Sequence, residues 1–192
     1  MKLVGLLLAA GSATRFGSDK LLHPLPHGVP MAVQAARNLR AELSRVIAVL
    51  RPGAGELGRR LADEGCETVF CAGAAEGMGA SLACGVRAVP DADGWLVALA
   101  DMPFVRPSTI AAVRDALATG APIAAPYYRA RRGHPVGFSA RFRGLLERCG
   151  GDEGARAILA AHEAEIVKVP VGDPGVLRDI DSPSDLAPPA TV

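Results

Sequence analysis

The 192-residue sequence predicts an α/β fold, with a mainly parallel sheet covered by helices on both faces. The first observation is that short apolar runs alternate along the chain with longer helical patterns, the order expected of repeated strand and helix units. The second is that residues 4–10 and 95–100 are continuously apolar, as strands buried on both faces are. The third is the composition, 49% apolar and 21% charged, which excludes a disordered chain.

The expected elements follow from this pattern. The strands lie at residues 3–9, 45–50, 67–71, 95–100, 123–125, 135–138 and 166–169. The helices lie at residues 31–43, 56–64, 80–88, 107–119, 140–149 and 154–162. Since we find no linker or repeat, and this length is usual for one domain, residues 1–192 are expected to form a single domain. Ligands bind beyond the carboxyl ends of strands in such sheets, so functional residues are expected directly after the apolar runs.

Charge and aromatic content argue against nucleic acid and membrane surfaces as partners. The 21 basic and 20 acidic residues give a net charge of +1, which provides no global field for a polyanion. One Trp, two Tyr and five Phe are few for stacking on bases. No apolar stretch approaches the ~18–20 residues that span a membrane.

The N-terminus and the cysteines favour a cytoplasmic protein. The apolar run after Lys2 resembles a secretory signal, but a cut near Ala13 would give a signal shorter than the usual ~15–30 residues, so we interpret the run as a buried strand. The cysteines show no C-x-x-C pair and no zinc spacing, and are expected to be reduced, partly buried thiols. They are Cys66, Cys71, Cys84 and Cys149.

The loop after the first strand has the residue types of a phosphate-binding turn. Its small residues let a ligand approach the backbone, whose free N–H groups can hold phosphate. The expected backbone contacts are Leu8, Ala9, Ala10 and Gly11. Arg15 and Lys20 add two cations to the same loop, although an ordinary turn with two solvated cations would look alike. It is not a Walker P-loop, because Lys20 does not directly follow Gly17.

Acidic residues occur in two later segments, directly after residues 95–100 and within residues 179–185. Asp101 comes directly after the apolar run at 95–100, where hard-metal ligands sit in phosphoryl-transfer sites; the expected helix begins only near Pro107, so a capping role is less natural. Asp179 and Asp181 would face the same way in an extended stretch, which leaves open which of them is the second ligand. The other interpretation of this segment is an acidic turn that caps a short helix. The sequence thus indicates a Mg²⁺ site shared by two distant acidic loops.

Two glycine-containing segments complete the candidate site. In residues 76–82, which precede a helix, Gly79 and Ser81 are candidate contacts to a base or ribose. In residues 131–137, His134 is a candidate contact to a phosphorylated acceptor, although a lone histidine is more often structural.

Together these motifs resemble the MobA-like nucleotidyltransferases of molybdenum cofactor biosynthesis. The similarity runs in family order from residue 3 to about 186, on these motifs: Leu8-Ala9-Ala10-Gly11, Arg15-Phe16-Gly17 with Lys20, Gly77-Met78-Gly79-Ala80-Ser81-Leu82, Asp101-Met102-Pro103, Arg132-Gly133-His134-Pro135 and Asp179-Ile180-Asp181-Ser182-Pro183-Ser184-Asp185. The resemblance implies a three-layer Rossmann-like fold of the nucleotide-diphospho-sugar transferase type. It also implies Mg²⁺-dependent transfer of a nucleoside monophosphate from an NTP to a phosphate, with release of pyrophosphate.

Within the family, Ala10 makes the first motif more similar to the cytidylyltransferases, since the GTP-using enzymes more often have a second glycine there. The resemblance therefore implies transfer of CMP from CTP to a molybdopterin-type acceptor, with a molybdoenzyme or its chaperone as a candidate partner. Arg15 and Lys20 would balance phosphate charge, Asp101 and Asp181 would hold Mg²⁺, and His134 would face the acceptor. In such a reaction the nucleophile is already an anion, so positioning and charge neutralisation suffice.

Other functions stay open at this point. The base could be guanine, the acceptor could be another small phosphorylated molecule, or the chain could be a non-catalytic nucleotide-binding accessory protein of a molybdoenzyme. Residues 53–58 match G-x-G-x-x-G, but Arg51 and Pro52 separate them from the strand and no clear strand-end acid lies about 20 residues further on, which argues against a dinucleotide-dependent oxidoreductase.

Overall fold

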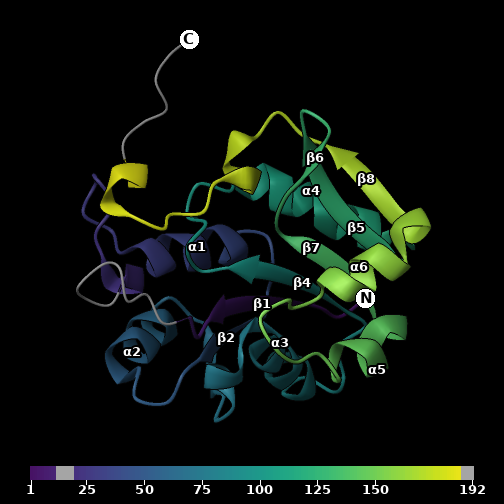
Figure 1. Cartoon of the computed structure of the whole chain (residues 1–192). Coiled ribbons are helices and arrows are strands. Elements are labelled where there is room, and N and C mark those ends of the chain that lie inside the picture. Colours follow the sequence, from purple (N-terminus) through teal and green to yellow (C-terminus); the bar gives the residue numbers. More distant parts are fainter. Residues whose placement is uncertain (12–19, 187–192) are drawn as a thin grey trace.

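The computed structural model describes residues 1–11 and 20–186. Their strands form one eight-stranded sheet in the order β3-β2-β1-β4-β7-β5-β6, with β8 on the other side of β5 (Figure 1). The strands are β1 (Leu3–Ala9), β2 (Val46–Leu50), β3 (Glu67–Phe70), β4 (Gly94–Leu99), β5 (Ile123–Tyr128), β6 (Arg131–Arg132), β7 (Val136–Ser139) and β8 (Ile166–Pro170). The helices are α1 (Met31–Arg40), α2 (Gly55–Asp63), α3 (Met78–Arg87), α4 (Pro107–Ala118), α5 (Arg143–Leu146) and α6 (Arg156–Ala161).

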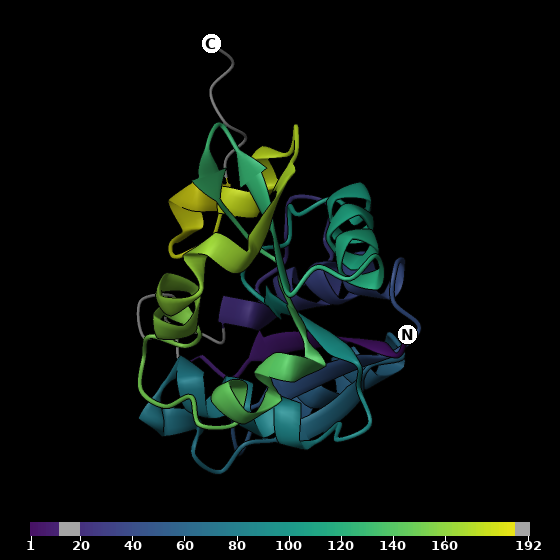
Figure 2. The ribbon, with the colours of Figure 1, turned by 90° about the vertical axis from the view of Figure 1, so that its right-hand side faces the viewer.

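The helices cover both faces of the sheet, as predicted (Figure 2). One apolar cluster joins the sheet to α1, α2 and α4, and a second joins it to α3, α5 and α6. Strand β1 shows why the sequence pattern is continuous: Leu7 belongs to the first cluster and Leu6 to the second, and both are fully buried. A central strand between two helical layers needs apolar side chains at every position.

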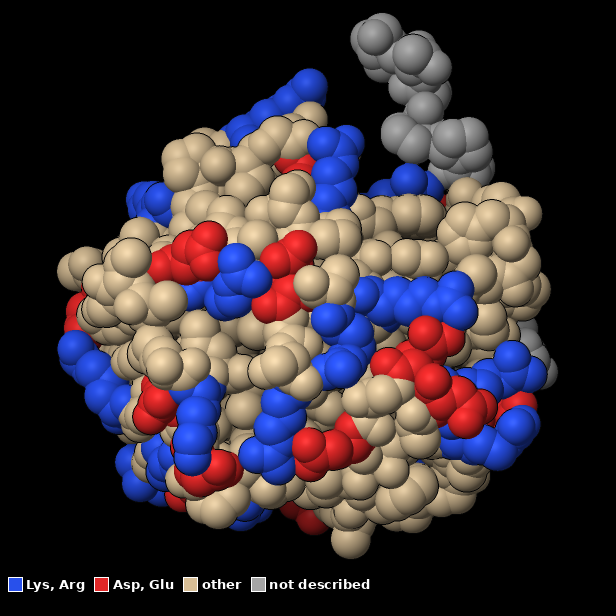
Figure 3. All heavy atoms as spheres, turned by 180° about the vertical axis from the view of Figure 1, so that it is seen from behind, with Lys and Arg blue, Asp and Glu red and all other residues tan. Residues whose placement is uncertain are grey.

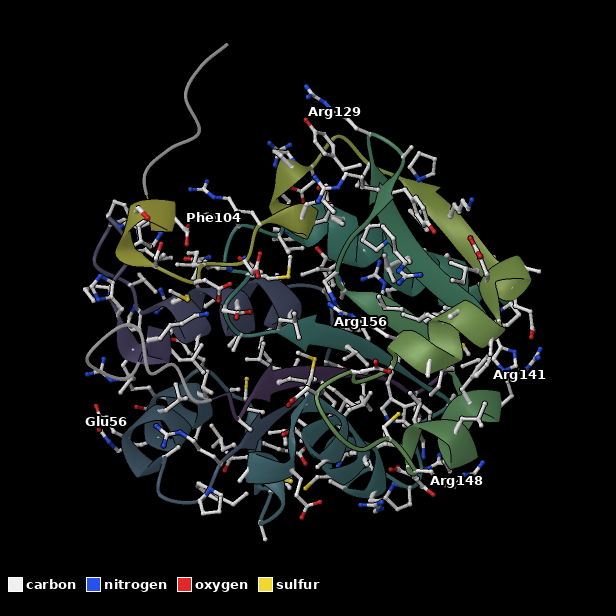
Figure 4. All side chains as sticks on the ribbon, in the orientation of Figure 1. Glu56, Phe104, Arg129, Arg141, Arg148 and Arg156 are labelled. Atoms are coloured by element: carbon white, nitrogen blue, oxygen red, sulfur yellow. The ribbon has the colours of Figure 1, made fainter. Side chains whose placement is uncertain are left out.

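The reversed strand β7 and the β5–β6 hairpin depart from the expected pattern. β7 pairs antiparallel with both β4 and β5, whereas β1 pairs parallel with β2 and β4. β5 continues to Tyr128 instead of ending at residue 125, and turns back through Arg129 and Ala130, whose φ angles are +47° and +63°. This turn contains neither Gly nor Asn, the residues that normally mark such a hairpin in a sequence. Figure 4 shows Arg129 pointing away from the molecule at its tip.

The two expected helices at 140–149 and 154–162 are shorter than predicted. The first is a 3₁₀ turn, Ala140–Phe142, followed by the short α5; the second is α6, which begins only at Arg156. Between them Gly151 and Gly154 adopt φ angles of +62° and +57°. Left-handed backbone interrupts a right-handed helix, so this segment forms a loop.

The cysteines and the surface agree with the sequence analysis. All four cysteines are free, with Cys66 and Cys71 buried, and burial raises the pKa of the Cys66 thiol to about 11. Acidic and basic side chains are interspersed on the face seen in Figure 3. None of the helices in the two described ranges has the length and apolar character that crossing a bilayer requires.

Candidate active site

A cleft of about 830 Å³ opens at the carboxyl ends of β1 and β4. Residues one or two positions beyond the ends of strands line much of it, as expected for this type of sheet. These are Ala10 and Gly11 after β1, Arg51 after β2, Ala72 after β3 and Asp101 after β4. The cleft is therefore formed where the sequence analysis placed the chemistry.

Lys20 is the centre of the charged part of this cleft. Its ammonium donates hydrogen bonds to Asp101 Oδ2 at 3.1 Å and to Asp181 Oδ1 at 2.8 Å. The Lys20 side chain is only 8% exposed, against 27% for Asp101 and 62% for Asp181. Burial alone would lower the pKa of Lys20, but the hydrogen bonds and charges of Asp181 and Asp101 outweigh it and raise this pKa above its ordinary value. Lys20 is thus a permanent cation that joins three distant segments.

The turn that carries Asp181 is held by its own hydrogen bonds. Asp185 Oδ2 accepts from the backbone N–H groups of Asp181, at 3.0 Å, and Ser182, at 2.7 Å. The N–H of Ile180 donates to the backbone oxygen of Asp101 at 3.0 Å, which fixes the turn against the loop after β4. Of the two acids left open by the sequence, Asp181 is the one brought to Lys20, whereas Asp179 is exposed and forms no ion pair with the described residues.

A buried carboxylate that the sequence analysis missed ties the same two segments together. Asp173 Oδ2 accepts from Thr109 Oγ1 at 2.7 Å and from the N–H of Arg106 at 2.9 Å, at the start of α4. Its Oδ1 accepts from the N–H of Gly175 at 3.0 Å. Gly175 lies so close to Phe104, on the loop after β4 (Figure 4), that an added Cβ would be 2.2 Å from its backbone oxygen. In the sequence, Asp173 looks like any turn-forming Asp before Pro174.

Three of the four residues predicted to contact the ligand through their backbone lie in the cleft, and the fourth does not. Leu8, Ala10 and Gly11 line the cleft. Ala9, 1% exposed, instead packs in the apolar cluster under α1 and α2. Arg15, the second predicted cation, lies outside the described residues.

Of the two residues predicted to contact a base or ribose, Ser81 lines the cleft and Gly79 does not. Ser81 is buried and lines the cleft. Gly79 does not line it: its N–H donates to the oxygen of Gly151 at 2.8 Å, and an added Cβ would lie 2.4 Å from the oxygen of Gly150. The loop that packs there, missed by the sequence analysis, brings Asp152 to the wall of the cleft.

His134 lies beside the cleft and is not among its lining residues. Its Nδ1 is buried without a hydrogen-bond partner among the described residues, and its backbone N–H donates to the oxygen of Val176 at 3.0 Å. Burial lowers the pKa of His134; a hydrogen bond to the backbone of Val97 and the charges of Asp101 and Asp179 oppose this shift, and the charge of Arg132 adds to it. The ring is therefore neutral at pH 7, a hydrogen-bonding group and not a cation.

The two carboxylates that accept hydrogen bonds from Lys20, those of Asp101 and Asp181, are also suitable ligands for a hard metal ion. Within the described ranges no three His, Cys, Asp or Glu side chains converge as a complete metal centre. Asp101 and Asp181 nevertheless present oxygens to one common cation, the Lys20 ammonium. Mg²⁺ and Mn²⁺ take such oxygens, and Mg²⁺ is usually held by one or two carboxylates together with substrate phosphates and water. The residues present therefore fit a divalent cation that arrives with a triphosphate.

The sequence is similar to known proteins over most of its length. The model of the MobA-like NTP transferase domain matches residues 5–166. The purine catabolism protein PucB of Bacillus subtilis (strain 168) is 29% identical over 195 residues, covering 95% of this chain and 93% of PucB.

Several solved structures are also similar to this chain over nearly its whole length. The structure of Rv0371c from Mycobacterium tuberculosis H37Rv is 28% identical, with a TM-score of 0.80 over 96% of this chain and 94% of that chain. Its manganese complex gives 26% identity and a TM-score of 0.76, covering 96% of both chains. A nucleotidyl transferase from Methanothermobacter thermautotroptrophicus is 25% identical, with a TM-score of 0.79 over 96% of this chain and 94% of that one.

More distant structures share the fold alone. One is the molybdopterin-guanine dinucleotide biosynthesis protein A from Archaeoglobus fulgidus, 19% identical with a TM-score of 0.68, covering 95% of this chain and 94% of that chain. The predicted three-layer fold of the nucleotide-diphospho-sugar transferase type is confirmed.

Proposed function

This chain belongs to the MobA-like NTP transferase domain family and is a nucleotidyltransferase, and from this premise we propose that it transfers CMP from CTP to the phosphate of a molybdopterin-type acceptor. The observation that carries the proposal is the pairing of Lys20 with Asp101 and Asp181 in a cleft at the carboxyl edge of the sheet. The choice of cytosine is supported by Ala10, the residue that makes the first motif similar to the cytidylyltransferases.

The chain's own residues supply positioning and charge. The acceptor phosphate attacks the α-phosphorus of the NTP, the bond to the β-phosphate oxygen breaks, and pyrophosphate leaves. Lys20 would stabilise the negative charge that builds on the α-phosphate, and its raised pKa keeps it charged for this task. Asp101 and Asp181 hold its ammonium in place, so little reorganisation is needed when the charge develops.

Asp101 and Asp181 would also hold a divalent cation, Mg²⁺ in our proposal. The manganese complex of Rv0371c supports a divalent cation in this fold. When bound, the ion neutralises triphosphate charge and so reduces its repulsion of the incoming anion. The second oxygen of each carboxylate makes no hydrogen bond to the part of the chain that the structure describes, which leaves it available for the ion.

The remaining candidates divide into a nucleotide side and an acceptor side. Backbone at Leu8, Ala10 and Gly11 would hold the nucleotide, with Arg15 as a second cation on its phosphates. Ser81 would contact base or ribose, while Ala9 and Gly79 would act through the backbone they position. His134 would face the acceptor as a neutral hydrogen-bonding group.

Release of pyrophosphate tests this function. Wild-type protein is given each of the four NTPs in turn, with Mg²⁺ or Mn²⁺ and with molybdopterin as acceptor; a polyol phosphate replaces molybdopterin in a parallel series. We expect CTP and molybdopterin to give the highest turnover, and a chelator to abolish it. Preference for GTP, or for the polyol phosphate, would change the assigned substrate, and NTP binding without pyrophosphate release would indicate a non-catalytic accessory protein.

Variants in the same assay test the two carboxylates. Asp101→Ala should lose ~10²–10³ in turnover, the scale for one transition-state charge contact. Asp181→Asn should show a loss of the same order, while Asp179→Asn, the matched control two residues away, should retain most of the activity. Equal losses in the two Asn variants would contradict the role given to Asp181.

A further inference from the structure

The loop between α5 and α6 forms one wall of the cleft. In Figure 1 it runs in front of β1 and α3. It rests on the start of α3 with almost no space between the backbones: an added Cβ on Gly77 would be 2.4 Å from Gly151, and one on Gly79 would be 2.4 Å from Gly150. A hydrogen bond from the N–H of Gly79 to the oxygen of Gly151, 2.8 Å long, closes the contact. The loop is therefore packed closely against the start of α3, although residues 150–153 are themselves exposed to solvent.

Asp152 is the side chain that this loop brings to the cleft. It lines the cavity together with Met78 and Ser81, and its Oδ1 lies beside Gly77, 2.5 Å from where a Cβ would stand. Asp152 is exposed, and it makes no hydrogen bond and no ion pair with any residue in the described ranges. A carboxylate in a binding cleft without a partner in the protein is available as a hydrogen-bond acceptor for a ligand.

The chemistry around Asp152 favours a nucleoside over phosphate. Its negative charge repels phosphate oxygens, which Lys20 on the loop after β1 attracts. The cleft wall near Gly77 is otherwise lined by small or apolar side chains, the surface that suits a base and a sugar. These are Ala72, Ala74, Ala75 and Met78.

We propose that Asp152 is a specificity-determining residue, which accepts a hydrogen bond from an N–H or O–H donor of the nucleoside in the cleft. The inference rests on the proposed function, because it takes an NTP as the ligand. In CTP two groups carry such donors, the exocyclic amino group of the base and the ribose hydroxyls. The glycines at 77 and 79 then act indirectly, since they let the loop approach closely enough for Asp152 to reach the ligand.

The test is a binding titration of the whole protein with CTP and Mg²⁺, without acceptor, compared with inorganic tripolyphosphate. Asp152→Ala should weaken CTP binding about tenfold or more, the scale for a hydrogen bond to a charged group, and leave tripolyphosphate binding unchanged. Glu153→Ala, which removes the neighbouring exposed carboxylate that does not line the cleft, is the matched control and should bind both ligands as wild type does.

Analogues identify the donor. If Asp152 accepts from the base amino group, wild type and Asp152→Ala bind the 2-pyrimidinone analogue of CTP alike, because its base has a hydrogen atom where cytosine has its amino group and carries no ring N–H. If it accepts from ribose, the two proteins bind the 2′- or 3′-deoxy analogue of CTP alike. Either result supports the proposal.

Gly79→Ala provides a second variant that leaves the carboxylate in place. Its Cβ would push the loop away, so CTP binding should fall as in Asp152→Ala while tripolyphosphate binding is retained. Gly172→Ala is the control, because nothing lies within 4 Å of an added Cβ there. Circular dichroism verifies that each variant is folded.

Three results would overturn the inference. Asp152→Ala could bind CTP as tightly as wild type, it could lose CTP and tripolyphosphate equally, or it could bind both more tightly, which would place the carboxylate against the phosphates. Failure of the proposed function is distinct: wild type would then bind CTP with the Asp152 dependence described, yet release no pyrophosphate with any acceptor. A wild-type protein that binds no NTP would contradict both.

Discussion

Lys20 shows how one side chain can organise a charged site. The Lys20 side chain is only 8% exposed, and two carboxylates from segments 81 and 161 residues away replace water around its ammonium. The carboxylates remain more exposed than the lysine and so can still accept a second cation. Lys20 is thus a candidate phosphate contact and also the residue that holds Asp101 and Asp181 close to each other.

Replacing Lys20 with Met separates these two roles. Turnover should fall by about 10²-fold or more, because the charge on the α-phosphate loses its partner. Stability should change by about 1 kcal/mol or less, since Met fills the same space and both carboxylates still reach water. Pyrophosphate release and urea unfolding measure the two effects. A collapse of the unfolding midpoint would show that Lys20 is primarily structural.

His134 gives a prediction about pH. Burial lowers its pKa in the folded protein, so below about pH 6.5 the unfolded chain binds more protons at this position than the folded one does. Stability should therefore fall as the pH decreases from 7 to 5, and His134→Gln should make this part of the decrease smaller. Chemical unfolding of both proteins across that range measures it. Identical pH profiles would mean that His134 does not titrate differently on folding.

At this scale the sequence indicated the residue types of the site but not their individual roles. That Lys20 and Asp101 lie in one cleft could be predicted, because they follow strands whose carboxyl ends meet at one edge. The choice between Asp179 and Asp181 could not be made, since the extended geometry assumed for them is broken by the hydrogen bonds of Asp185. Asp152 was missed because its position depends on contacts between glycines about 70 residues apart.

At the scale of elements, Asp173 is the residue that fixes the segment carrying Asp181. It is buried, and three donors from Arg106, Thr109 and Gly175 converge on it. Asp173→Ala leaves these donors without an acceptor and should cost about 3 kcal/mol or more of unfolding free energy. Turnover measured well below the unfolding temperature should fall too, because the loop after β4 and the turn of Asp181 lose their common support.

Asp63→Ala is the control for this prediction, as Asp63 is exposed at the end of α2. It should change the unfolding free energy by less than about 0.5 kcal/mol. If Asp173→Ala were as mild as this control, the clamp would be unimportant and the two segments would be held by their apolar contacts alone.

Element boundaries were predictable where local signals exist. Helix α4 begins at Pro107 as predicted, and ends one residue before the expected position. The β5–β6 hairpin was not predicted, because Arg129 and Ala130 in its turn have positive φ angles, which neither residue type normally adopts. The helix expected at 140–149 was overestimated, since tertiary contacts of Gly150 and Gly151 with α3 compete with helix formation there.

At the scale of the molecule, strand and helix alternation was enough to predict a parallel sheet with two helical layers. The reversal of β7 could not be seen in the sequence, because an apolar run of four residues has no direction. That reversal also changes which residues meet at the carboxyl edge. β7 begins opposite Val97 of β4, so His134, just before it, lies at the level of the loop that carries Asp101.

Since the strands found in residues 1–11 and 20–186 all belong to one sheet and both apolar clusters span several elements, we expect the chain to show a single cooperative unfolding transition. Calorimetry should give equal calorimetric and van't Hoff enthalpies. CTP with Mg²⁺ at 100 times its Kd should add about 2.7 kcal/mol of stability, and Asp101→Asn should reduce this gain. Two resolved transitions, or stabilisation by CTP that Asp101→Asn leaves intact, would contradict this description.

Arg129 and Ala130 form a two-residue turn between the antiparallel strands β5 and β6. Neighbours that run in opposite directions can be joined by almost any length of chain, whereas parallel neighbours need a full crossover. Insertions at 129–130 would therefore leave every crossover of the sheet intact. The fold thus has, at Arg129 and Ala130, a position where added residues would leave the strands that form the cleft unchanged.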